Sequence, residues 1–154
     1  MIRFISLIIT TVLTSGLLFG QDQALADSLK ILLENKTYTS NKEHLSIIDN
    51  LCDEYMAFDF PKAKEAAKTM MRLSKKFNEP DYTATSYESL GSIFYLQGLN
   101  DSSLIYLRKG LELRIKNKQE EKKYITKNNI ANVYRTIGKY DSSISVYTEV
   151  LKYF

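Results

Sequence analysis

The sequence predicts an all-α protein built from repeated pairs of antiparallel helices, and two observations lead to this fold class. Two segments that begin at Gly98 and Gly138, forty positions apart, share the pattern Gly-x-x-Asp-Ser-Ser followed by an apolar run. The chain of 154 residues also holds only six glycines and two prolines, which leaves little room for the tight turns of a sheet protein. Repetition at a fixed period is typical of stacked helical units that share one core.

The first twenty residues differ from the rest of the chain. Met1-Ile2-Arg3 carries one positive charge, residues 4–19 are apolar apart from Ser and Thr, and a polar chain begins at Gly20-Gln21. This layout predicts a secretory signal peptide, residues 1–20, with cleavage after Gly20 or after Ala26. The alternative is an uncleaved membrane anchor, although about 16 apolar residues fall short of the ~20 that span a bilayer. We therefore expect an exported protein, periplasmic or extracellular.

The remaining chain divides into a leading segment and three units. A short helix near Leu25 to Leu33, within residues 21–39, is expected to cover the exposed end of the first unit. The units are predicted at residues 40–80, 81–120 and 121–154, the last shortened in its second helix. Ser40-Asn41-Lys42-Glu43 predicts a capping box at the start of the first unit. Gly98 and Gly138 predict left-handed helix ends.

Large and small residues recur at helical spacing in each unit, and these positions define the predicted packing. A small residue follows a large aliphatic one in the first helix of each unit, and a second small residue recurs in the following helix, so two helices should cross closely there. The predicted packing positions are Leu51, Cys52, Tyr55, Ala63, Tyr87, Leu90, Gly91, Phe94, Ser103, Leu107, Ile130, Ala131, Tyr134, Ser143 and Tyr147.

This arrangement resembles a known repeat family. Tyr87-x-x-Leu90-Gly91-x-x-Phe94, followed by Ser103-x-x-x-Leu107, is similar to the tetratricopeptide repeat (TPR) pattern W-x2-L-G-x2-Y and A-x3-F. The resemblance covers about residues 40 to 154, and the period of forty resembles the long variant of the repeat, whose usual length is about 34. It implies a right-handed α-solenoid of about three units, in which the first helix of each unit lines a concave face.

The resemblance also implies a function. TPR proteins bind peptides or partner proteins on the concave face, so we expect a non-catalytic interaction module. The groove-facing positions carried over from the family are Asp49, Asp53, Met56, Glu88, Ser92, Tyr95, Asn128, Asn132 and Arg135. Asparagines at successive helical turns can hydrogen-bond the backbone of an extended peptide. The alternative is that these are simply the polar exposed positions that any solenoid needs.

No residue constellation predicts catalysis, and we expect no catalytic residue, no cofactor and no metal. His44 is the single histidine and is expected to be solvated, while Cys52 occupies a small packing position. The net charge of +3 is too small to indicate nucleic-acid binding. The basic run from Lys116 to Lys127 contains two glutamates and is expected to be a solvated helix junction.

The last helix raises a second hypothesis. The sequence reaches Lys152-Tyr153-Phe154 within the helix that begins near Asp141, and no polar capping helix follows, so Ile144, Tyr147 and Leu151 would lack part of their packing surface. Self-association through this helix, or contact with another chain, would cover them. Alternatively, the signal segment, leading helix and long repeats resemble the extracytoplasmic front half of certain bacterial membrane-bound sensors, which continue into a histidine kinase or a helix-turn-helix regulator.

Overall fold

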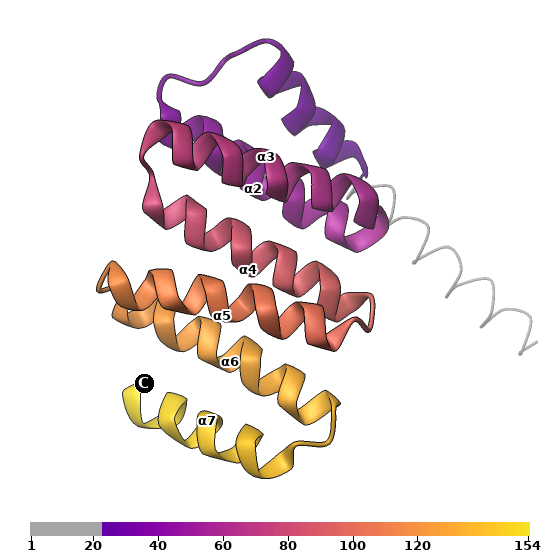
Figure 1. The fold of residues 1–154 in the computed structure, drawn as a ribbon. Coiled ribbons are helices and arrows are strands. Elements are labelled where there is room, and N and C mark those ends of the chain that lie inside the picture. The colour runs from indigo at the N-terminus through magenta and orange to yellow at the C-terminus, as the bar shows by residue number, and fades with distance from the viewer. Residues whose placement is uncertain (1–22) are drawn as a thin grey trace, which may run out of the picture.

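The computed structural model describes residues 23–154, which form a single stack of helices (Figure 1). No strand occurs within these residues, and the predicted all-α repeat fold is confirmed. A helix over residues 23–34 precedes the elements α2 Asn41–Phe58, α3 Phe60–Phe77, α4 Pro80–Leu96, α5 Asn100–Lys116, α6 Glu120–Thr136 and α7 Tyr140–Tyr153. The predicted signal peptide, residues 1–20, lies outside the described residues.

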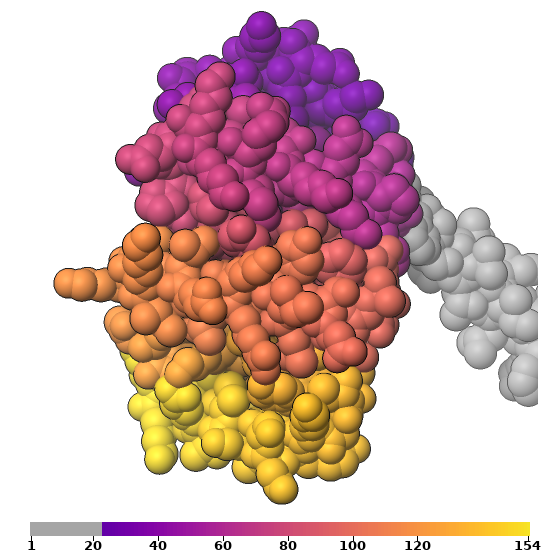
Figure 2. All heavy atoms as spheres, viewed as in Figure 1, coloured from indigo at the N-terminus to yellow at the C-terminus, as the bar shows by residue number. Residues whose placement is uncertain are grey.

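The helices form two layers. Helices α2 and α3, α4 and α5, and α6 and α7 pack as consecutive pairs. Helix α4 also contacts α2 and α6, whereas α3, α5 and α7 make no contact with one another in the part of the chain described. In a curved stack, the helices on the concave side lie closer together than those on the convex side. Helices α2, α4 and α6 therefore form the inner, concave layer, and α3, α5 and α7 form the outer layer. Side chains fill the spaces between the ribbons (Figure 2).

The first unit begins with a hydrogen-bonded cap that resembles the predicted capping box. The Ser40 hydroxyl oxygen accepts a hydrogen bond of 3.1 Å from the Glu43 amide N, as expected for an N-cap. The returning bond differs, because the Glu43 carboxylate accepts from the amide N of Thr39, at 2.6 Å, and from the Thr39 hydroxyl. The cap therefore reaches one residue further back than the sequence predicted.

Left-handed residues separate the helices. Gly98 and Gly138 both have φ of +74°, and an added Cβ would meet no atom within 4 Å. The backbone conformation alone therefore favours glycine at these two turns, as predicted. At the junctions between units, Asn78 and Lys118 take φ of 57° and 55°. The polar residues before each junction extend α3 and α5, so the long repeat period is accommodated in longer helices.

The small positions allow close approach of the paired helices. A Cβ on Gly91 would lie 2.6 Å from the Leu107 Cγ, so α4 and α5 could not keep this distance with any larger residue. In the third unit, the Ser143 hydroxyl donates a hydrogen bond of 2.9 Å to the carbonyl oxygen of Ala131. Both contacts join a small position of a first helix to the second helix of the same unit.

The two ends of the stack differ in how well their apolar residues are covered. The helix over residues 23–34 buries Ala26 completely, and Leu29 packs against the core of the first unit. At the other end, Ile144 is 63% and Leu151 is 77% exposed on α7. Tyr147 is half-buried. No helix among the described residues is long and apolar enough to cross a membrane.

Candidate functional site

The inner layer begins with two neighbouring carboxylates on α2. Asp49 is half-buried, and neither Asp49 nor Asp53 lies within 4 Å of a described cationic group. Burial, followed by repulsion from Asp53 and Glu88, raises the pKa of Asp49 to about 6, although Lys122 and Arg114 act weakly in the opposite direction. Burial also raises the pKa of Asp53. This acidic end of the inner layer is therefore suited to a positively charged group.

Glu88, the next acidic residue along the inner layer, is already engaged within the protein. Arg114 of α5 is 2% exposed and binds both Glu88 oxygens, with Nε 2.9 Å from Oε1 and Nη2 2.7 Å from Oε2. The hydroxyl of Thr126, from α6, also donates to Oε1. Glu88 thus joins α4 to α5 and to the following unit, and both of its oxygens are occupied.

The same arginine holds a larger polar network, which we call the Arg114 cluster. Arg114 binds the Asp81 carboxylate, and its remaining donors lie 2.9 Å from Thr85 Oγ1 and from Gln119 Oε1. Lys122 Nζ lies 2.7 Å from Asp81 Oδ2. Desolvation alone would raise the pKa of Asp81, but the hydrogen bonds from Lys122 and Arg114 outweigh it and lower the pKa. The cluster comprises Asp81, Thr85, Glu88, Arg114, Gln119, Lys122 and Thr126.

A glycine makes room for this network. A Cβ on Gly110 would lie 2.8 Å from the Glu88 Cγ. The positions forty residues away from Gly110 hold Met70 and Val150, so the second unit alone has lost its large apolar residue there.

The sequence interpretation missed the Arg114 cluster, although it contained a signal. Arg114 follows Leu107 by seven residues, which places an arginine on the buried side of α5. The expectation of a solvated junction at Lys116–Lys127 was wrong in part. Lys122 pairs with Asp81, and Lys127 pairs with Glu149 of α7. Periodicity alone could not show these partners because they come from different helices.

The end of the inner layer formed by α4 and α6 carries more amide and hydroxyl side chains than the acidic end on α2. Ser92, Tyr95 and Asn132 line a cavity of about 60 Å³ between α4 and α6. Tyr95 and Thr136 share a hydrogen bond of 3.0 Å between their hydroxyls, which links α4 to α6. The Tyr147 hydroxyl donates to Asn132 Oδ1 at 2.7 Å. Tyr95 and Asn132 therefore support the inner layer as well as lining it.

The remaining groove-facing positions differ in how accessible they are. Asn128 is half-buried and Arg135 is exposed, both on α6. Met56 is half-buried and packs against the core of the first unit. Among the predicted groove-facing positions with polar side chains, no side-chain hydrogen bond or ion pair is found in residues 23–154 for five: Asp49, Asp53, Ser92, Asn128 and Arg135.

The two residues singled out for reactivity have structural surroundings. Burial raises the pKa of the Cys52 thiol to about 12, and Sγ donates to the Ala63 carbonyl oxygen at 3.3 Å. His44 is half-buried rather than solvated, its ring stacks on Tyr38 with 4.0 Å between centroids, and burial lowers its pKa. Among the described residues, no three His, Cys, Asp or Glu side chains are grouped to hold a metal ion.

Comparison with known proteins gives similarity at the level of structure. No family model matches the sequence, and no curated protein matches it. BtubC (BKLC) from P. vanneervenii superposes with a TM-score of 0.67 and 19% identity over 87% of this chain and 54% of that chain. The STAND protein PH0952 from Pyrococcus horikoshii, described as having a tetratricopeptide repeat sensor, superposes with a TM-score of 0.69 and 25% identity. That match covers 83% of this chain and 20% of PH0952.

A third similar structure has the same kind of repeat. The putative kinesin light chain from Podosopora anserina, described as having nearly identical TPR-like repeats, superposes with a TM-score of 0.66 and 17% identity over 86% of this chain and 66% of that chain. The present chain thus spans about half of BtubC and a fifth of PH0952. By its fold, this chain is a TPR-like helical repeat protein.

Proposed function

We propose that this chain is a non-catalytic interaction module whose inner layer binds an extended, positively charged segment of a partner protein. The observation that carries the proposal is the pair Asp49 and Asp53, neither of which has a described cation within 4 Å, while Asp49 is half-buried. Burying a carboxylate without a partner is costly, and a bound Lys or Arg would offset that cost. The TPR-like fold supports protein partners in general.

The rest of the inner layer supplies contacts for the backbone of such a segment. Ser92 and Asn128 offer a hydroxyl and an amide beyond the acidic end, and neither depends on the ligand's side chains. The Arg114 cluster lies between these ends and fixes α4 against α5 and α6. We therefore expect the two ends to keep a constant separation when a partner binds.

Selection of peptides on the purified full chain tests this function. Peptides selected from a random displayed library should be enriched in Lys and Arg, and their affinity should fall about tenfold or more for Asp49→Asn/Asp53→Asn. The matched control neutralises two acidic residues of the outer layer, Asp101→Asn/Glu112→Asn, and should bind as the wild type does. Selection of acidic or apolar peptides, or equal losses in the two variants, would contradict the proposal.

We also propose that the protein is exported, because residues 1–20 carry the pattern of a secretory signal peptide. Fusion of these residues to alkaline phosphatase in a bacterial host measures export directly. Activity in the periplasm supports the proposal. Activity that stays equally low with or without the twenty residues contradicts it.

A second candidate is the sensor part of a longer membrane-bound signalling protein. The exposed side chains of Ile144 and Leu151 on α7 favour it, because a following helix, another chain or a second copy would bury them. Reading the gene beyond the codon for Phe154 distinguishes these cases. A downstream apolar span and output domain would support a sensor, whereas a stop codon would leave contact with another chain or self-association.

A further inference from the structure

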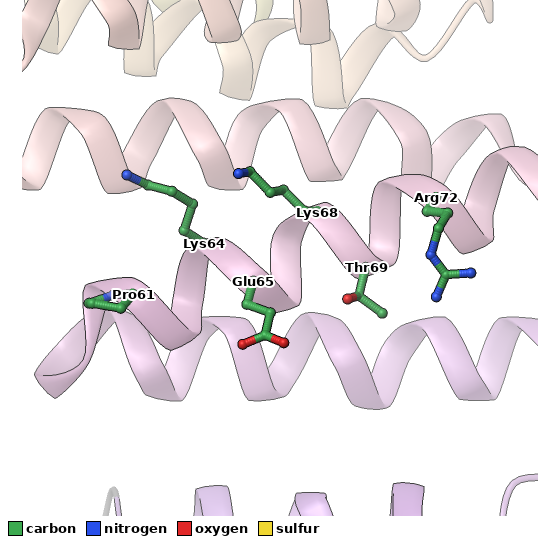
Figure 3. A pocket seen from close by; sticks show the side chains of 6 residues that line it. All are labelled: Pro61, Lys64, Glu65, Lys68, Thr69 and Arg72. Carbon is green, nitrogen blue, oxygen red and sulfur yellow. The ribbon is translucent and has the colours of Figure 1, made fainter.

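The outer layer carries a row of positive charges along α3. Lys64, Lys68, Arg72 and Lys75 follow one another at intervals of three or four residues, which places them along one side of the helix. Lys64 and Lys68 extend to one side of α3, whereas Glu65, Thr69 and the guanidinium of Arg72 extend to the other side in this view (Figure 3). The first three of these cations line a hollow of about 350 Å³, together with Pro61, Glu65 and Thr69. We call this row the α3 stripe.

No described acidic side chain forms an ion pair within 4 Å with the α3 stripe, although Glu65 lines the same hollow. The ion pairs found within 4 Å in residues 23–154 are all formed by lysines and arginines outside the stripe. On α3 itself, Lys62 pairs with Asp59. Lys68, Arg72 and Lys75 are exposed. Four positive charges within about 16 Å of helix repel one another, and an anionic partner would relieve that repulsion.

Aromatic rings lie beside the stripe and orient its lysines. Lys64 Nζ lies 4.6 Å from the ring centroid of Phe94, and Lys75 Nζ lies 5.9 Å from that of Tyr87. Lys109 Nζ, from α5, also lies 5.9 Å from the ring centroid of Tyr87. These cation–π contacts hold the ammonium groups of α3 and α5 along the same row of rings, which lowers the entropic cost of binding an anion.

We propose that the α3 stripe binds an acidic, Asp- or Glu-rich segment of a partner protein. An extended strand of about five residues matches the length of the stripe, at ~3.3 Å per residue. The α3 helix exposes no large apolar side chain for insertion into a bilayer, because its large apolar residues are buried or half-buried. The faces of Phe94 and Tyr87 already hold lysines, so they offer no stacking platform for nucleobases.

Binding of labelled hexaglutamate to the full chain, followed by fluorescence anisotropy at low and at high salt, tests this proposal. The wild type should bind, and binding should weaken as salt increases. Lys68→Glu/Arg72→Glu should lose about tenfold or more of the affinity. The control Lys139→Glu/Lys152→Glu makes the same change in net charge at exposed sites of the third unit and should bind as the wild type does.

Other outcomes decide against the proposal. It is overturned if hexaglutamate does not bind, or if the two reversals weaken binding equally. Two competitors are compared with hexaglutamate at the same concentration of negative charge: vesicles of phosphatidylserine and phosphatidylcholine in equal parts, and oligothymidylate. The proposal is also overturned if the chain binds either competitor more tightly than hexaglutamate. If the reversed variant does not fold, Lys68→Gln/Arg72→Gln replaces it, with a smaller loss expected. The inner-layer variant Asp49→Asn/Asp53→Asn should leave this binding unchanged, so the two proposals stand or fall separately.

Discussion

Gly110 and Glu88 are matched across the contact between α4 and α5, because a Cβ on residue 110 would lie only 2.8 Å from the Glu88 Cγ. Gly110→Ala should therefore destabilise the protein by roughly 1–3 kcal/mol. Helix propensity alone predicts the opposite sign, since alanine is favoured over glycine by about 1 kcal/mol within a helix. Chemical denaturation followed by circular dichroism measures the difference.

A double-mutant cycle separates the contact from other effects of the glycine. With Glu88→Ala already present, the space beside residue 110 is open, so Gly110→Ala should no longer destabilise. An unchanged cost in that background would show that the Glu88 contact is not the reason for the glycine.

The Arg114 cluster should contribute strongly to stability. Arg114→Met leaves the half-buried Glu88 carboxylate without its counter-charge, whereas Asp81 keeps Lys122, so we expect a loss of about 3–5 kcal/mol. Arg114→Lys should restore little, because a lysine cannot bind both Glu88 oxygens in the same way. Arg135→Met, at an exposed position, is the control and should change stability by less than about 0.5 kcal/mol.

The small position at Gly91 gives a further test of the helix crossing. Gly91→Leu would drive a side chain into Leu107, where even a Cβ comes within 2.6 Å of Cγ. We expect a loss of about 3 kcal/mol or more, measured as a drop in the thermal midpoint. Glu112→Leu, exposed on α5, should be near neutral. Similar losses in the two variants would mean that α4 and α5 do not cross closely at residue 91.

Asp49 makes the stability of the protein depend on pH. Its pKa is about 6 in the folded chain and about 3.9 in an unfolded one, so the folded state binds more protons between these values. Protonated Asp49 therefore contributes its full share to the free energy of unfolding below pH 4. This contribution is lost as the pH rises through 6 and the buried carboxyl ionises. Asp49→Asn should stabilise the protein at pH 7, by on the order of 1–2 kcal/mol, and have little effect below pH 4.

Urea denaturation at a series of pH values measures this effect. Asp101→Asn, at an exposed position in the first turn of α5, is the control and should not reproduce the gain at pH 7. An Asp49→Asn variant that is as stable as the wild type at pH 7 would show that Asp49 carries no unfavourable charge in the folded protein.

Features that depend on spacing along the chain were predictable from the sequence. The repeat of small and large residues fixed the helix pairs, and Gly98 and Gly138 marked two of the turns, because each signal needs only local conformation or helical periodicity. The Thr39 contact in the first cap was not predictable, since Ser40 and Glu43 allow either return bond.

The candidate site was less predictable, because it depends on partners from different helices. The family pattern placed Glu88 in the groove with Asp49, but it could not show that Arg114 occupies both Glu88 oxygens. Gly110, which makes this possible, is a single departure from the repeat.

Photo-crosslinking tests the central claim, that the inner layer binds a partner segment, most directly. A photoreactive amino acid at Ser92 should crosslink to a peptide selected on the wild-type chain, and unlabelled peptide should compete. The same group at Glu112, on the outer layer, should give no crosslink with that peptide. Crosslinking at Glu112 and none at Ser92 would contradict the claim.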